Sequence, residues 1–188
     1  MEQVLTSLPR PWVEVGIGSG RFAQALGIDI GLDPSRELLY IARDRGAEVL
    51  LSRGEEAPFS DGSFGAVFLI ATLCFADSAE GILAEAARLL KNGGKVVLGL
   101  VLKESPWGQV YQIQKGMGHR FYRYAKFYAY SEVELFLKQT GFHIENVIST
   151  LFQTPGEVNH IEMPRQGFAV DAGFTVILAG KSAVCEKE

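Results

Sequence analysis

Short runs of apolar residues recur along the chain, separated by segments in which apolar residues have the spacing of amphipathic helices. Most of these runs are almost continuously apolar and rich in Val, Ile and Leu, which is typical of strands buried on both faces of a mainly parallel sheet. We expect strands at residues 12–15, 28–32, 48–52, 66–72, 95–102, 143–150 and 174–179. Because strands and helices alternate, the pattern predicts an α/β fold with a doubly wound sheet.

The segments between the strands carry signals for the ends of helices. We expect helices at residues 34–45, 78–92 and 131–141. Pro34 opens the first of them, because proline is favoured at the first position of a helix. The pairs Asp77 and Glu80, and Ser131 and Glu134, have the spacing of a capping box at the starts of the other two.

Residues 103–130 interrupt this alternation with an aromatic and basic segment after the fifth strand. Insertions at the carboxyl ends of strands are where open α/β sheets build ligand sites. About ten residues precede the first strand, which is too few for a helical lid at the amino end. We therefore expect residues 103–130 to form a lid on the substrate side of a site.

The composition, with 47% hydrophobic and 21% charged residues, is that of an ordinary globular protein and predicts one domain, residues 1–188. The net charge of -4 gives no global field toward nucleic acid or an anionic membrane. The longest apolar run, residues 67–76, is about half of the roughly 20 residues that a membrane helix needs. Cys74, Cys185 and the three histidines lack the spacing of a metal site. We expect a cytoplasmic protein with no metal, nucleic-acid or membrane partner.

Three alternate glycines, Gly16, Gly18 and Gly20, come directly after the first apolar run. Glycines at this spacing let the backbone turn tightly and approach a ligand without a Cβ in the way. A short helix should follow, and its first amides would point into the site. In the dinucleotide-binding pattern GxGxxG the third glycine stands three positions after the second, and Arg21 occupies that position here. The observed GxGxG pattern therefore fits a nicotinamide dinucleotide poorly.

Two carboxylates flank this glycine turn. Glu14, on the first strand, would repel a pyrophosphate but attract the ammonium group of an amino acid. Asp33 ends the second strand, where a carboxylate can accept hydrogen bonds from both hydroxyls of a ribose. The alternative for Asp33 is a helix N-cap before Pro34. A ligand with adenosine at one end and an amino acid at the other satisfies both carboxylates, which favours S-adenosylmethionine as the cofactor.

Four stretches of the chain resemble, in order and spacing, the motifs of class I SAM-dependent methyltransferases: VEVGIGSGRFA, GLDPS, GEEAPFSDGSFGAVFLIATL and EAARLLKNGGKVVLG. The chain is most similar to the small-molecule, methyltransferase type 11 (UbiE-like) branch. The resemblance covers about residues 12–102, and the later stretch FYRYAKFYAYSEVELFLKQTGF resembles the segment that follows in that branch. It implies a seven-stranded, mainly parallel sheet with the last strand antiparallel and a methyl-donor site at the ends of the first two strands.

The resemblance also implies roles for single residues in binding the methyl donor. Glu14, Gly16, Gly18 and Gly20 would hold the methionine part, and Asp33 would hold the ribose.

After the third strand, the backbone of Gly54 and Glu55 would contact the adenine. Arg53 stands where the family often has an Asp, and an arginine cannot accept a hydrogen bond from the adenine amino group. Ala71 opens the stretch after the fourth strand where family members carry specificity motifs, and we count it with the cofactor-binding residues. The Asn-Pro-Pro-Tyr and Pro-Cys motifs used on nucleic-acid bases are absent there.

Methyl transfer from a sulfonium needs mainly a positioned nucleophile and the exclusion of water, so a catalytic base is optional. His119 is the best candidate base, because it lies among the basic residues of the insertion. The candidate substrate-binding residues share the same insertion: Trp107, Tyr111, Arg120, Tyr122, Arg123 and Tyr124. Their aromatic rings would form apolar walls, and Arg120 and Arg123 would hold an anionic group of the acceptor. The alternatives are a solvated helix face packed on aromatic residues, or a surface that stacks on nucleic acid.

The leading hypothesis is a SAM-dependent methyltransferase that acts on an oxygen, nitrogen or carbon nucleophile of a small molecule. A protein that binds SAM or S-adenosylhomocysteine without turnover is the alternative. A nicotinamide-dependent oxidoreductase ranks third, because Gly20 and Glu14 fit it poorly. The pattern leaves the oligomeric state open, with a homodimer as one option.

Overall fold

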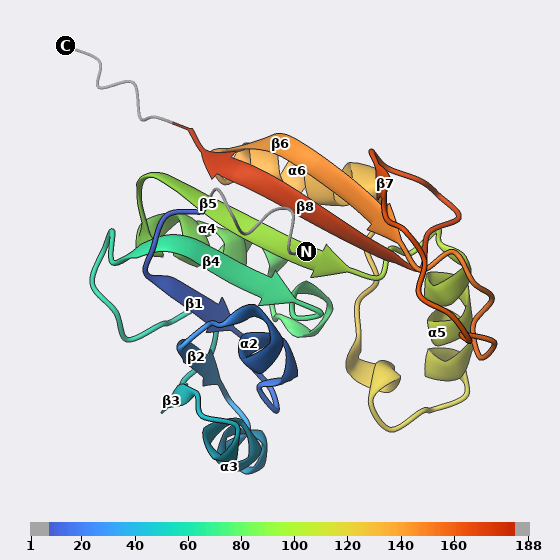
Figure 1. Ribbon diagram of the computed structural model, residues 1–188, viewed down its shortest axis with the longest axis horizontal. Helices are drawn as coiled ribbons and strands as arrows, with labels where there is room; N and C mark the ends of the chain where they lie inside the picture. The colour runs from blue at the N-terminus through green and yellow to red at the C-terminus, as the bar shows by residue number, and fades with distance from the viewer. Residues whose placement is uncertain (1–7, 183–188) are drawn as a thin grey trace.

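One twisted sheet runs through the protein, as Figure 1 shows for the computed structural model, which describes residues 8–182. Its strands are β1 (Trp12–Val15), β2 (Ile30–Asp33), β3 (Glu48–Leu51), β4 (Phe64–Ile70), β5 (Leu90–Leu100), β6 (Phe142–Thr150), β7 (Arg165–Gln166) and β8 (Phe174–Lys181). Their order across the sheet is β3-β2-β1-β4-β5-β8-β6-β7. Strands β1 to β5 pair in parallel, whereas β8 is antiparallel to both β5 and β6. The predicted doubly wound α/β sheet, with the last long strand antiparallel, is confirmed.

The sheet has eight strands in the described residues rather than the seven expected. The additional strand, β7, has only two residues, and both are exposed at the edge of the sheet. So short a polar strand leaves no hydrophobic pattern in the sequence. The second strand also begins at Ile30, two residues later than expected.

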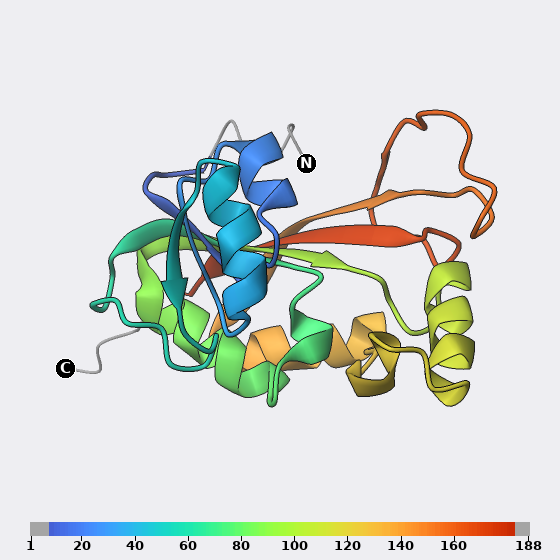
Figure 2. The ribbon, with the colours of Figure 1, turned by 90° about the horizontal axis from the view of Figure 1, so that it is seen from below.

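Helices cover both faces of the sheet. Figure 2 shows α2 (Arg21–Leu26) and α3 (Arg36–Asp44) on one face, and α4 (Ala79–Leu89) and α6 (Tyr130–Gln139) on the other. Among the described helices, none is both long and apolar enough to cross a membrane. Cys185 lies outside the described residues.

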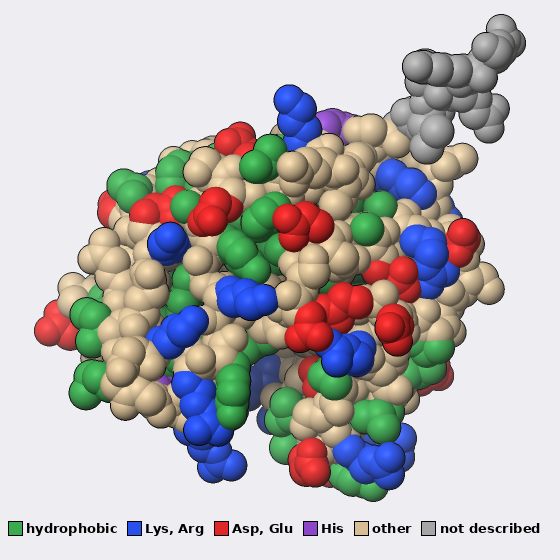
Figure 3. Space-filling view, turned by 180° about the vertical axis from the view of Figure 1, so that it is seen from behind, with side chains coloured by type: hydrophobic (Ala, Val, Ile, Leu, Met, Phe, Trp, Pro, Cys, Tyr) green, Lys and Arg blue, Asp and Glu red, His purple; other side chains and the backbone are tan. Residues whose placement is uncertain are grey.

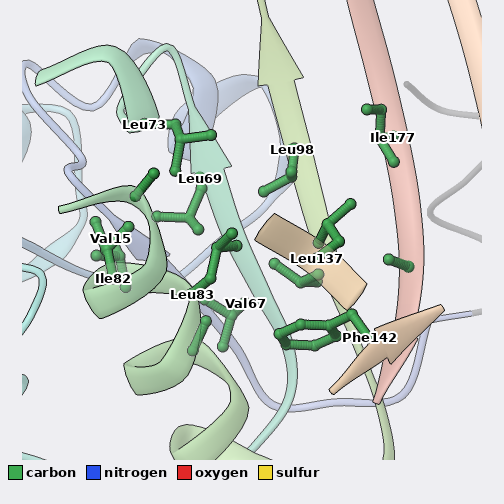
Figure 4. Close-up of a cluster of buried hydrophobic side chains, with 14 of the residues drawn as sticks. Val15, Val67, Leu69, Leu73, Ile82, Leu83, Leu98, Leu137, Phe142 and Ile177 are labelled. Atoms are coloured by element: carbon green, nitrogen blue, oxygen red, sulfur yellow. The ribbon is translucent and has the colours of Figure 1, made fainter. Parts of the chain in front are cut away.

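The hydrophobic core forms two layers, one on each face of the sheet, because alternate side chains of a strand point to opposite faces. All seven residues of β4 are buried, with Val67 and Leu69 in the layer under α4 and α6 and Phe68 in the layer under α2 and α3. Figure 4 shows the first layer, where Leu83 and Leu137 bring the two helices onto the strands.

The helix starts differ from the expected ones by one or two residues. Ser35, not Pro34, precedes α3, and its side chain accepts the backbone N–H of Leu38 at 3.3 Å. Ser78, not Asp77, caps α4 by accepting the N–H of Gly81 at 3.0 Å.

The helix α6 begins at Tyr130, and Glu132 rather than Glu134 closes its first turn by accepting the N–H of Ala129 at 2.7 Å. The helix α4 also ends at Leu89, because the residues that follow it begin β5. At the starts of α3 and α4, neighbouring polar residues offered more than one capping register, whereas the N-cap of α6 is Ala129.

The insertion at residues 103–130 is not an open loop. It forms α5 (Pro106–Gly116) and the short 3-10 helix η2 (Tyr122–Tyr124), which stand beside the carboxyl ends of β4 and β5 (Figure 1). Ser105 caps α5 by accepting the N–H of Gly108 at 2.9 Å. A side chain at Gly108 would collide with the Leu102 carbonyl, so α5 packs closely on the end of β5.

Arg88 of α4 holds the segment that leads into β4. Its guanidinium donates to the carbonyls of Ala57 at 3.0 Å and Phe59 at 2.8 Å, and pairs with Asp61 at 2.6 Å and Glu85 at 2.6 Å. These contacts keep the start of the central strand against the helix.

We expect Arg88→Met to lower the free energy of unfolding by about 2–3 kcal/mol, because it removes several charge-assisted hydrogen bonds and takes the Arg88 donor from the Phe59 carbonyl, whereas the Ala57 carbonyl keeps the N–H of Phe59. Arg43→Met is the matched control, since Arg43 is exposed and forms no ion pair among the described residues. We expect the control to change stability by less than about 0.5 kcal/mol. Urea unfolding of both variants checks this, and equal losses would contradict the assigned role of Arg88.

Candidate active site

The glycine turn joins β1 to α2 at the carboxyl edge of the sheet. Gly16, Gly18 and Gly20 all have positive φ angles, of 76°, 53° and 74°, which glycine adopts without strain. The N–H groups of Gly16 and Ile17 donate to the Leu32 carbonyl at 2.8 and 3.0 Å, so the turn is fastened to β2.

The three glycines have different surroundings. A Cβ at Gly16 would collide with the Thr72 side chain, and a Cβ at Gly20 would lie 3.0 Å from the backbone of Ala42. A Cβ at Gly18 would meet nothing within 4 Å. Gly16 and Gly20 therefore allow close packing of the turn, whereas Gly18 faces open space in which a ligand can lie.

Asp33 stands at the end of β2 and braces the glycine turn. Its Oδ2 accepts the N–H of Gly18 at 2.9 Å, and its Oδ1 accepts the N–H of Ser35 at 2.8 Å. The interpretation of Asp33 as a helix N-cap is wrong, because Ser35 fills that role for α3. Each carboxylate oxygen can accept a further hydrogen bond.

Glu14 lies on β1 with only 1% of its surface exposed. Burial raises the pKa of its carboxyl to about 8; the backbone N–H of Ala23 opposes this shift and the nearby Asp33 adds to it. Its Oε2 has no hydrogen-bond partner among the described residues. A buried carboxyl with a free oxygen is an acceptor suited to a cation.

The segment after β3 packs against the segment after β4. A Cβ at Gly54 would lie 2.6 Å from Ile82 and 2.8 Å from Val15, so close packing requires this glycine. The carboxylate of Glu55 accepts the N–H of Asp77 at 2.9 Å, and Arg53 pairs with the Asp77 side chain. Arg53, which replaces the Asp that the family often has, thus has a structural partner.

The end of β4 touches the glycine turn. Ala71 has a positive φ of 55°, and its N–H donates to the Gly99 carbonyl at 2.8 Å. The next residue, Thr72, donates its hydroxyl to the carbonyls of Ile70 at 3.1 Å and Gly16 at 3.4 Å. The backbone bend at Ala71 therefore places the end of β4 beside the turn.

A cavity of about 350 Å³ begins at Ala71 and extends under the insertion. Its walls come from the end of β5, from η1 (Leu73–Phe75) and from α5, η2 and α6. They are formed by Ala71, Cys74, Phe75, Leu100, Val101, Leu102, Tyr111, Phe121, Tyr122, Lys126, Phe127, Tyr128 and Val133. Figure 3 shows the molecule from the α4 and α6 face, with a hollow in its lower edge flanked by hydrophobic side chains.

Most polar groups of the cavity walls are thiol and phenol groups. Burial raises the pKa of the Cys74 thiol to about 12. The rings of Tyr111 and Tyr122 stack with their centroids 4.3 Å apart. Burial raises the pKa of Tyr122 above its usual range, and a hydrogen bond with Tyr111 adds to this shift.

The structure brings two of the six predicted substrate-binding residues, Tyr111 and Tyr122, into the cavity wall. The indole N–H of Trp107 instead donates to the Gln153 carbonyl at 3.0 Å. Arg120, Arg123 and Tyr124 are exposed and lie outside the cavity lining. The guanidinium of Arg123 lies over the Tyr124 ring, 4.5 Å from its centroid.

The candidate base His119 is exposed outside the lining, with its ring stacked on Tyr122 at 4.7 Å. Its Nδ1 accepts the N–H of Phe121 at 3.3 Å. Its role as a base stays a prediction, as do the binding roles of Trp107, Arg120, Arg123 and Tyr124. Among residues 8–182, no group of three His, Cys, Asp or Glu side chains is placed to hold a metal ion.

The remaining cavity residues were not singled out from the sequence as binding residues. Leu100, Val101 and Leu102 lie where β5 ends, and Val133 comes from α6. In the sequence these four residues are recognisable only as hydrophobic, and the residues of the core are hydrophobic as well.

Comparisons with known proteins agree with this geometry. Residues 13–98 match the family model of a methyltransferase domain. An uncharacterised protein of Mycobacterium tuberculosis is 41% identical over 171 residues. These residues are 90% of this chain but only 60% of that relative. A demethylmenaquinone methyltransferase of Tropheryma whipplei is 35% identical over 95 residues, which are 46% of this chain and 39% of that enzyme.

One solved structure is similar over nearly the whole chain. It is a SAM-dependent methyltransferase from Thermotoga maritima, a possible histamine N-methyltransferase, with a TM-score of 0.89 and 38% sequence identity. The similarity covers 96% of this chain and 86% of that one. The predicted resemblance is confirmed, and the chain belongs to the SAM-dependent methyltransferases, whose cofactor is S-adenosylmethionine.

Proposed function

We propose that this protein transfers the methyl group of S-adenosylmethionine to a small molecule bound in the cavity beside Ala71. The observation that carries the proposal is the contact between the cavity and the glycine turn. Ala71 lines the cavity, and its neighbour Thr72 hydrogen-bonds to Gly16. A donor held by the turn and an acceptor held in the cavity would therefore meet at the end of β4.

The residues at the turn fit the cofactor. Gly18 leaves open space for the methionine part, and Oε2 of Glu14, which has no partner among the described residues, would receive its ammonium group. Asp33 would accept from the ribose hydroxyls, and the backbone of Gly54 and Glu55 would contact the adenine. The bound cofactor supplies a methyl group activated by a sulfonium.

The chain itself would position the acceptor and exclude water. Holding two reactants in a reactive arrangement supplies on the order of 7–11 kcal/mol of barrier reduction in favourable cases. The apolar walls of the cavity, including Tyr111 and Tyr122, leave little room for water beside the acceptor. A base is not required for this function.

The size of the cavity and the overall charge support a small acceptor rather than a nucleic acid. A volume of about 350 Å³ fits a small molecule, and the net charge is -4. The relative from Thermotoga maritima is a possible histamine N-methyltransferase, which also favours a small acceptor. We propose that residues 1–188 form one methyltransferase domain that works in the cytoplasm, with 103–130 covering the substrate side.

Binding and turnover together test the proposed function. We expect the protein to bind SAM and S-adenosylhomocysteine in calorimetry, and to form S-adenosylhomocysteine when a panel of small metabolites is added. Binding without turnover on any acceptor would favour a SAM-binding protein without catalysis. Failure to bind either compound would contradict both functions.

We expect Gly18→Ala to weaken SAM binding at least about tenfold, since its Cβ would occupy the open space beside the turn. Gly62→Ala is the matched control, because Gly62 also has a positive φ (64°) and a Cβ there would meet only one atom, at 4.0 Å. Both variants should lose about 1 kcal/mol of stability from backbone strain. Calorimetry measures the loss of SAM affinity, and thermal unfolding measures the loss of stability. Equal SAM affinity in both variants would contradict the placement of the cofactor beside Gly18.

The pH dependence of Glu14 gives a second test. Because its pKa is raised to about 8 in the folded state, its stabilising contribution is full below the unfolded value of 4.5 and is lost as pH rises toward 8. Glu14→Gln should therefore match the wild type near pH 4.5 and become more stable than it by several kcal/mol at pH 8.

The same substitution should weaken SAM binding, because a neutral amide cannot pair with an ammonium group. Binding by the wild type near pH 7 should release a proton, which is measured by calorimetry in two buffers with different heats of ionisation. If no proton is released and the affinity of Glu14→Gln for SAM is unchanged, Glu14 does not bind the cofactor.

A further inference from the structure

Among residues 8–182, the side chains that line the cavity beside Ala71 include a single charged one, Lys126, and neither a carboxylate nor a histidine. The ammonium group of Lys126 donates to the Asp77 carbonyl at 2.7 Å, and its backbone N–H donates to the Cys74 carbonyl at 2.7 Å. Lys126 is exposed, so its apolar stem lines the cavity while its charge is directed to the surface.

Three other polar side chains of the walls, those of Cys74, Tyr122 and Tyr128, keep their protons at neutral pH. The thiol of Cys74 has a pKa of about 12 and so keeps its proton. Burial also raises the pKa values of the phenols of Tyr122 and Tyr128, so both stay neutral. These groups can donate hydrogen bonds, but none of them is a base.

The side chains of the cavity walls limit which chemical class of nucleophile can react there. An alcohol or a phenol reacts readily only after losing a proton, and the cavity has no group to accept one. A carboxylate or a thiolate would lose the hydration of its negative charge between apolar walls whose described cation, Lys126, already donates to the Asp77 carbonyl, and this is costly even beside the sulfonium of the donor. A carbon nucleophile has no lone pair, and its methylation leaves a proton on carbon that a base must remove. An uncharged nitrogen has a reactive lone pair and needs neither a base nor a counterion.

We propose that the acceptor is a small aromatic amine or heteroaromatic nitrogen base that enters the cavity uncharged. This inference rests on the proposed function. The nitrogen lone pair forms the new N–C bond while the C–S bond breaks and its electron pair goes to sulfur. The positive charge thus moves from sulfur to nitrogen. A methylated amine then loses a proton to water after release, whereas a heteroaromatic nitrogen that carries no proton keeps the charge.

The aromatic walls suit this movement of charge. Phe127 and Tyr128 are not stacked on another ring of the described residues, and ring faces of this kind attract a cation. They therefore tolerate the positive charge as it passes to nitrogen, and the same rings stack on an aromatic acceptor. The volume of about 350 Å³ is near the lower end for ligand pockets, which limits the acceptor to one or two fused rings.

Four probes of similar size test the nitrogen preference at saturating SAM: N-methylaniline, p-cresol, phenylacetate and benzyl mercaptan. We expect N-methylaniline to be methylated at least about thirty times faster than the other three. It should also bind to protein loaded with S-adenosylhomocysteine in calorimetry. Equal or faster methylation of p-cresol, phenylacetate or benzyl mercaptan overturns the proposal, and so does a panel in which N-methylaniline is not methylated.

The pH profile separates a base-free transfer from one that uses a protein base. With N-methylaniline, which is uncharged near neutral pH, kcat/KM should stay flat between pH 6.5 and 8.5. With benzylamine it should rise about tenfold per pH unit, because only the minor uncharged form reacts. A bend at the same pH for both amines that disappears in His119→Ala identifies a protein base and overturns the proposal.

A pair of variants places the acceptor against the aromatic wall. Tyr122→Leu should raise KM for N-methylaniline about tenfold with unchanged affinity for S-adenosylhomocysteine. Tyr40→Leu, on the exposed surface of α3, should change neither value. Equal KM values in both variants overturn the assignment of the aromatic wall. If the wild type binds neither SAM nor S-adenosylhomocysteine, the proposed function itself has failed.

Discussion

The hydrogen bond from the Gly18 backbone to the Asp33 carboxylate joins the two strand ends on which the whole site is built. The Leu32 carbonyl adds two further bonds to the same turn, so β1 and β2 end as one unit. Gly16 then leaves room for Thr72, which brings the end of β4 against that unit. The distance between the turn and the cavity is therefore set by the pairing of β1 with β2 and β4.

The position of Glu14 in this arrangement lowers the stability of the ligand-free protein. Its carboxyl is buried on a central strand beside another carboxylate, with one oxygen unsatisfied, so it destabilises the ligand-free protein at neutral pH. An apolar residue of similar size would pack better. An energetic cost of this kind is typical of positions that a ligand compensates when it binds.

Much of the fold and the backbone of the glycine turn could be predicted from sequence, because both depend on local patterns. Continuous apolar runs mark buried parallel strands, and the spacing of Gly16, Gly18 and Gly20 after such a run marks the turn. Helix starts were less certain, because Asp77 and Ser78 are adjacent residues that can both cap a helix, and only the backbone geometry selects one.

The acceptor side could be predicted only in part. Residues 103–130 were located correctly at the carboxyl edge, but the sequence could not show which of their side chains turn inward. Arg120 and Arg123 were candidates because of their charge, yet charge favours contact with water, and the structure leaves both exposed. The wall is formed instead by rings such as Tyr122 and by residues from β5 and α6, which only the tertiary fold brings together.

The indole of Trp107 has a consequence for how acceptor preference could change. It joins α5 to the segment after β6 through the Gln153 carbonyl, and it packs so closely on Gly173 that no side chain fits there. The same helix carries Tyr111 into the cavity wall. A substitution that shifts α5 must therefore be matched by one around Gly173, so relatives that take different acceptors should vary at these two distant positions together.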